Sequence, residues 1–212
     1  MQQLINNVYF TLIFDFNKHG IVAPLYQVIN APNYTDTPIT FKSERKIYLN
    51  LKCFTSEQCL YQLAHEVTHT PFNIHNEPTQ WIEELLATYY SYSCLHNYPD
   101  YLRDRLSPKR SNAPKSWADL TEYIRNNLTH LETNPYAVYN HEVYSTVISS
   151  AFFDYFPSNV DFWTLLKILS SSANSFSSQS SFTSIELISK CNSLFPESKT
   201  ELRLLNGFLE ST

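Results

Sequence analysis

Apolar residues recur at helical spacing between about residues 56 and 70. They fall at positions i, i+3, i+4 and i+7, the pattern of a helix that buries one face. The stripe consists of Leu60, Leu63, Ala64 and Val67. Residues 55–58 read Thr-Ser-Glu-Gln, which resembles a capping box that begins a helix, and Pro71 disfavours helical geometry at Thr70. We therefore predict a helix over about residues 56–70.

Alternation of apolar and polar residues precedes this helix. Residues 38–41 and 46–51 alternate on either side of the short polar segment 43–45. A period of two is typical of strands with one buried face, and a short polar segment between two such runs favours a turn. The sequence therefore predicts a β-hairpin immediately before the helix.

A second long helix is predicted over about residues 78–97. This segment is rich in Leu and Tyr, Pro78 is favourable in a first helical turn, and Asn76 is a suitable capping residue. Downstream, Ser116 and Ser158-Asn159 are expected to cap further helices, and the stretch 170–184 contains nine serines and is expected to be a flexible connector. The remaining predicted helices span about 116–129, 158–169, 184–195 and 197–209, with another that begins at Asn134-Pro135.

These elements together predict an α+β, mostly helical fold. A small N-terminal sheet precedes the helix over 56–70, and a helical C-terminal half follows it. With 212 residues, of which 43% are hydrophobic and 15% aromatic, the chain is long enough to bury a core within one domain. We therefore predict a single domain over residues 1–212, with a sheet-containing part over about 1–70 and a helical part over about 71–212.

Composition and charge narrow the class of function. The net charge of −5 argues against nucleic acid as a partner, and the presence of only two glycines, Gly20 and Gly207, excludes a glycine-rich phosphate loop. The cysteines are scattered without a Cys-x-x-Cys pair, so we expect buried free thiols rather than zinc ligands. They are Cys53, Cys59, Cys94 and Cys191.

The apolar run from Val8 to Phe14 is expected to be a core element. No basic segment precedes it and no small-residue cleavage site follows it, which argues against a signal peptide. The run is also shorter than the roughly 20 residues that a membrane-spanning helix needs. We therefore expect a cytoplasmic protein without a membrane partner.

Candidate chemistry lies on the predicted helix, where His65-Glu66-Val67-Thr68-His69 forms an HExxH pattern. Residues four apart lie one above the other on a helix, so both imidazoles can reach the same metal ion. Glu66 is turned by about 100° from His65, which places it beside the metal, where it can take a proton from a water. A zinc ion with three protein ligands keeps one position open, lowers the pKa of a water there to about 7 and polarises a carbonyl.

The third metal ligand has more than one candidate. His75 gives the spacing His-Glu-x-x-His-x-x-Phe-x-x-His, which resembles the metzincin signature, although Phe72 stands where that family has Gly. Glu83 and Glu84 lie among apolar residues on the helix predicted over 78–97, and a buried carboxylate is costly unless it is paired or metal-bound. Ligand type favours Glu84, with Glu83 and His75 as alternatives.

The HExxH pattern followed by Glu84 resembles gluzincin zinc metallopeptidases, and the short spacing is most similar to the single-domain minigluzincins. The resemblance implies that His65, His69 and Glu84 hold Zn²⁺ and that Glu66 is the general base. It also implies an oxyanion donor on a later helix, for which Tyr144 is the candidate, with Tyr139 and His141 as rivals.

The same resemblance implies a peptide or protein substrate. In gluzincins, an exposed sheet edge upstream of the active-site helix holds an extended peptide by strand addition. The predicted function is therefore hydrolysis of peptide bonds through a metal-activated water. The alternative is a non-catalytic or regulatory binding module on the same scaffold.

Overall fold

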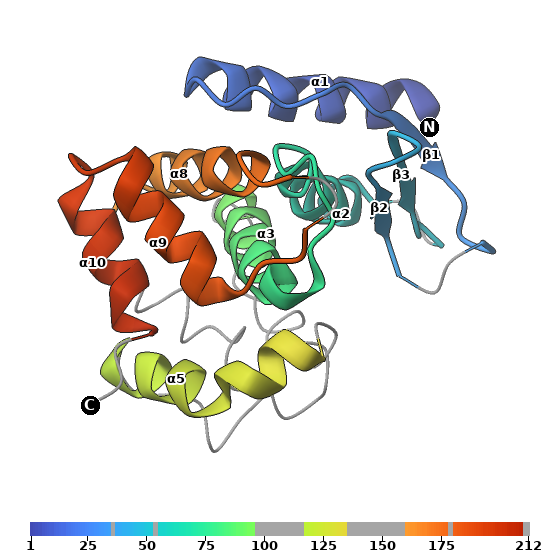
Figure 1. Ribbon diagram of the computed structural model, residues 1–212. Coiled ribbons are helices and arrows are strands. Elements are labelled where there is room, and N and C mark those ends of the chain that lie inside the picture. The colour runs from blue at the N-terminus through green and yellow to red at the C-terminus, as the bar shows by residue number, and fades with distance from the viewer. Residues whose placement is uncertain (35–36, 53–54, 96–116, 135–159, 178–179, 210–212) are drawn as a thin grey trace. The chain divides into compact units, whose positions relative to one another are not determined.

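The computed structural model describes residues 1–34, 37–52, 55–95, 117–134, 160–177 and 180–209 (Figure 1). The fold is α+β and mostly helical, with a small sheet near the N-terminus, as predicted. Two compact units divide the chain: Met1–Asn73 with Leu86–Tyr98, and Ile74–Leu85 with Pro99–Thr212. The first break lies close to the change from sheet to helix predicted at about residue 70, while a single domain over 1–212 stays a prediction.

The sheet of the first unit contains three strands in the order β1-β3-β2. The predicted hairpin is confirmed, because β2 (Ile39–Phe41) and β3 (Lys46–Leu49) are antiparallel, with Ile39 opposite Tyr48. The sequence did not predict β1 (Gln27–Asn30), which pairs in parallel with β3. In this sheet β3 is central, so β2 is an edge strand.

Helix α1 (Gln2–Lys18) contains the apolar run from Val8 to Phe14. The prediction of a core element is confirmed for one face, which contacts α2 and β1. The side-chain amide of Gln2 donates to the carbonyl of Val28 on β1 at 3.1 Å, so α1 also holds this strand. The buried residues of α1 are Ile5, Tyr9, Leu12, Ile13 and Phe16.

Helix α2 (Ser56–Thr68) begins where the sequence predicted and is two residues shorter than the predicted range. Its N-cap is Thr55, whose hydroxyl accepts a hydrogen bond from the Gln58 N–H at 3.1 Å. The Gln62 side chain ties α2 to the end of β3: its oxygen accepts from the Asn50 N–H at 2.9 Å, and its amide donates to the Asn50 carbonyl at 3.0 Å. These two hydrogen bonds fix the position of α2 relative to the end of β3.

The helix predicted over 78–97 consists of the 3-10 turn η1 (Glu77–Thr79) and helix α3 (Gln80–Cys94). Pro78 lies in the first turn, as predicted. Asn76 is the N-cap residue, as predicted, but its side chain makes no capping bond. Its amide bonds the backbone of Phe182 instead, donating to the carbonyl at 2.8 Å and accepting from the N–H at 3.1 Å.

The second unit also contains α5 (Trp117–Thr133), α8 (Phe162–Asn174), α9 (Ser184–Leu194) and α10 (Lys199–Gly207). These helices confirm the predicted elements, with shifted bounds for α8. Its cap is Asp161 rather than Ser158-Asn159, because the Asp161 carboxylate accepts from the N–H groups of Trp163 and Thr164. The helix expected from Asn134-Pro135 onward falls largely outside the described residues.

The serine-rich stretch 170–184 is not a connector throughout, which corrects the prediction. Ser170 and Ser172 are buried within α8, and Ser184 is buried in the first turn of α9. The hydroxyls of Ser170 and Ser184 donate to the backbone carbonyls of Lys167 and Pro78, each at 3.4 Å. The prediction of a linker from serine content was therefore wrong for the parts of this stretch that belong to α8 and α9.

Cys59 and Cys191 are buried free thiols, as predicted, and Cys94 is a free thiol that is half-buried. Burial raises the pKa of each of these thiols to about 11. Among the helices of the described residues, none combines the length and the apolar character needed to cross a membrane.

Candidate metal centre

Two histidines of α2 face the same side of the helix. His65 lies in the last turn, and His69 is the C-cap residue, whose φ of −75° and ψ of −20° continue the helical geometry. The four-residue spacing therefore places the rings one above the other, with centroids 5.3 Å apart and planes at 65°. Both side chains are buried, with exposed fractions of 9% and 6%.

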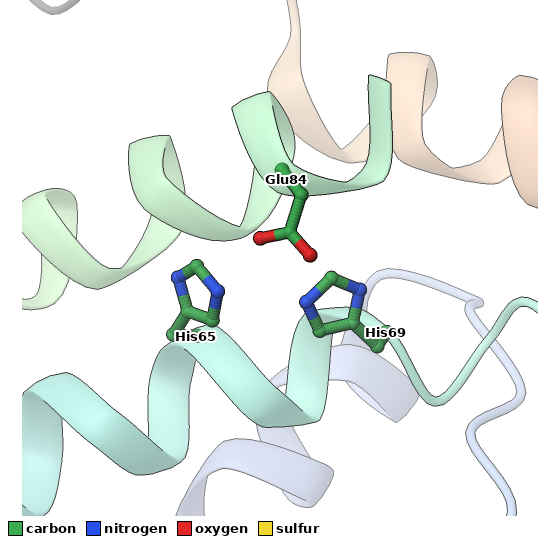
Figure 2. Close-up of side chains that lie close together, drawn as sticks. All are labelled: His65, His69 and Glu84. Carbon is green, nitrogen blue, oxygen red and sulfur yellow. The ribbon is translucent and has the colours of Figure 1, made fainter. Parts of the chain in front are cut away.

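Glu84 lies in the second turn of α3 and completes the group. Its carboxylate is buried and points toward both imidazoles (Figure 2). One donor atom from each of His65, His69 and Glu84 lies within 4.8 Å of the other two. The structure therefore brings together the three residues that the sequence predicted as metal ligands.

The chemistry of this group fits a metal ion. Two imidazole nitrogens and a carboxylate oxygen form the donor set of many zinc hydrolases. With metal–ligand bonds of about 2.0–2.1 Å, donor atoms on a tetrahedral ion lie roughly 3.4 Å apart, so closure from 4.8 Å needs side-chain shifts of about 1 Å or less. Burial favours an ion here, because a cation offsets the cost of a buried carboxylate. The buried group can hold a metal ion.

The two alternative ligands lie outside this group. His75 is exposed and does not belong to it. Glu83 is buried, but a neighbouring residue on a helix points about 100° away from Glu84, and its oxygens are not within the group. Among the described residues, the geometry favours Glu84 as the third ligand.

Glu66, the candidate general base, is also buried, with 3% of its surface exposed. The hydroxyl of Thr40 on β2 lies 2.7 Å from its Oε2 atom and 3.1 Å from its backbone oxygen. The edge strand of the sheet therefore contacts the residue that lies between the two histidine ligands in the sequence. Sequence reasoning did not identify Thr40, because the contact joins residues 26 positions apart.

Side chains near the start of α3 hold the segment that carries Glu84. The Gln80 amide donates to Glu84 Oε1 at 3.4 Å, from one helical turn earlier. The Trp81 indole N–H donates to the Ser184 hydroxyl at 3.0 Å, and Asn76 bonds the backbone of Phe182. The spacing of four could have predicted the contact between Gln80 and Glu84. The contacts of Asn76 and Trp81 with residues 182 and 184 could not be predicted, because these residues are more than 100 positions apart.

Tyr144, the candidate oxyanion donor, lies in the stretch 135–159 outside the described residues, as do its rivals Tyr139 and His141. The assignment of an oxyanion donor among these three residues therefore stays a prediction.

Compared with protein-family models, with curated proteins and with solved structures, the chain matches none. The resemblance to gluzincins therefore stays a prediction from the sequence.

Proposed function

We propose that this chain is a zinc-dependent peptidase that hydrolyses peptide bonds through a metal-activated water. The observation that carries the proposal is the convergence of His65, His69 and Glu84 within 4.8 Å in a buried group, with Glu66 adjacent in the sequence. A buried carboxylate is costly unless it is paired or metal-bound, and with two imidazoles beside it the group has a donor set typical of zinc.

Zinc is the metal that suits this donor set best. Mixed imidazole and carboxylate ligation with one open position is typical of catalytic zinc, whereas magnesium and calcium prefer oxygen ligands alone. Once bound by His65, His69 and Glu84, zinc would lower the pKa of a water to about 7 and polarise the substrate carbonyl.

Two further side chains take part in the proposed reaction. Glu66 accepts the proton that the attacking water loses and returns it to the leaving amine. Tyr144, by resemblance to gluzincins, donates a hydrogen bond to the oxygen that becomes negatively charged.

Strand β2 offers a means of aligning the substrate. It is an edge of the three-stranded sheet, so its outer backbone groups can pair with an extended peptide. Thr40, in the middle of β2, contacts Glu66 directly. A peptide added beside β2 would therefore lie close to the proposed base.

The decisive experiment compares the wild-type chain with Glu66→Gln. Zinc-loaded protein is incubated with a randomised mixture of peptides, with and without a chelator, and products are identified by mass spectrometry. We expect chelator-sensitive cleavage by the wild type and none by Glu66→Gln, because the amide is nearly isosteric and cannot take the proton. Zinc content and melting temperature of the variant should match those of the wild type.

A wild-type protein that binds zinc and cleaves no peptide would contradict the peptidase function. The chain would then be a binding or regulatory module on a metallopeptidase scaffold, and Glu66→Gln would leave its biological effect unchanged.

A further inference from the structure

The side chain of Thr40 on β2 contacts Glu66, and its place on the strand explains this contact. Side chains alternate along a strand. Ile39 is 36% exposed, whereas Thr40 is half-buried and its hydroxyl contacts α2. The register of β2 against β3 therefore determines that a hydroxyl, rather than an apolar side chain, faces Glu66.

The hydroxyl has a single hydrogen and two acceptors within reach. It lies 2.7 Å from Glu66 Oε2 and 3.1 Å from the Glu66 backbone oxygen. The shorter distance favours donation to the carboxylate. Contact with Oε2 restricts rotation of the carboxylate.

We propose that Thr40 is a positioning residue for Glu66, whose hydroxyl holds the orientation of the carboxylate that exchanges the proton. This role rests on the proposed peptidase function. The water forms its bond to the carbonyl carbon as its proton passes to the Glu66 carboxylate, and the same proton moves to the amine nitrogen as the carbon–nitrogen bond breaks. Through both transfers the Thr40 hydroxyl keeps its own proton, and the Glu66 backbone oxygen offers it a second acceptor.

The proposed role of Thr40 also connects substrate alignment with proton transfer. The same strand that offers its edge to an extended peptide holds the base, so the distance between the scissile carbonyl and Glu66 is determined within one element. Displacing a catalytic group by about 1 Å lowers rates by roughly 100-fold. A single hydroxyl on β2 is therefore expected to affect kcat more than substrate binding.

The test uses the zinc-loaded full chain and the best-cleaved peptide from the randomised mixture. Thr40→Val removes the hydroxyl at nearly constant volume, and Thr40→Ser keeps it. Thr133→Val is the matched control, because the Thr133 hydroxyl donates to the Thr129 carbonyl at 2.8 Å within α5, outside the HExxH motif. Thr40→Ala removes the same hydroxyl with a smaller side chain in case Thr40→Val does not fold.

We expect kcat to fall by about tenfold to 100-fold in Thr40→Val, with KM and zinc content unchanged. Thr40→Ser should restore most of the rate, and Thr133→Val should keep the wild-type rate. An unchanged kcat in a folded variant without the hydroxyl would overturn the positioning role and leave the peptidase function intact. A wild type without cleavage would overturn the peptidase function, and the role with it.

A second measurement does not depend on activity. Urea unfolding of metal-free protein is compared for Thr40→Val, Glu66→Ala and the double variant. A bond between the two side chains predicts that the losses of stability are non-additive, because Thr40→Val has less to remove once the carboxylate is absent. Additive losses would show that the hydroxyl does not hold the carboxylate and would overturn the proposal.

Discussion

Glu83 and Glu84 are adjacent buried carboxylates of α3, and only Glu84 has an oxygen within the donor group. We expect Glu84→Ala to lower zinc affinity by more than about 100-fold, because removal of a direct ligand exceeds the 10-fold to 100-fold effect typical of supporting residues. Glu83→Ala and His75→Ala are the matched controls. Competition with a chromophoric chelator measures the affinities, and an equal loss in His75→Ala would favour the metzincin-like ligand set.

The oxyanion role of Tyr144 is tested by deleting only its hydroxyl. We expect Tyr144→Phe to lower kcat by about 10²–10³ with little change in KM, because the hydroxyl would meet charge that develops in the transition state. The melting temperature should not change, since the ring remains. A lower melting temperature with unchanged kcat would indicate a core tyrosine, and His141 and Tyr139 would become the candidates.

At the scale of the elements, the start of α3 depends on Asn76. Its side chain bonds the buried backbone N–H and carbonyl of Phe182 and donates to the Thr79 hydroxyl at 2.8 Å. We expect Asn76→Ala to lower the free energy of unfolding by about 2–4 kcal/mol, because two buried backbone groups lose their partners. Asn192→Ala, in an exposed part of α9, is the control and should change stability by less than about 0.5 kcal/mol. Urea unfolding measures both, and equal losses would contradict the prediction.

Local signals predicted most of these elements, and contacts between distant residues explain what was missed. The Thr55 cap and the apolar stripe predicted α2, and the motif on it predicted two of the three buried donors. Strand β1 has four residues and pairs with β3, so its own sequence carries little pattern. Asn76 lies 106 positions from its partner Phe182, and no local rule distinguishes that contact from a cap.

At the scale of the whole molecule, zinc binding should stabilise the native protein. A ligand at 100 times its dissociation constant contributes about 2.7 kcal/mol, which raises the melting temperature of a chain of this length by roughly 5–11 °C. Differential scanning calorimetry with zinc and with a chelator measures the shift, and Glu84→Ala should abolish it. Equal melting temperatures would contradict metal binding by the native state. The number of transitions tests the single-domain prediction, because independent domains would unfold separately.

The buried thiols give the protein an internal reporter of helix opening. With a pKa of about 11, Cys59 of α2 and Cys191 of α9 are roughly one part in a thousand ionised at pH 8, whereas an exposed thiol is about one quarter ionised. Alkylating reagents attack the thiolate. When the helix opens and exposes its thiol, the ionised fraction of that thiol, and with it the rate of alkylation, would rise roughly 200-fold. In a Cys53→Ser background, the labelling rate of Cys59 would follow how often the helix that carries both histidines opens, and adding zinc would slow it.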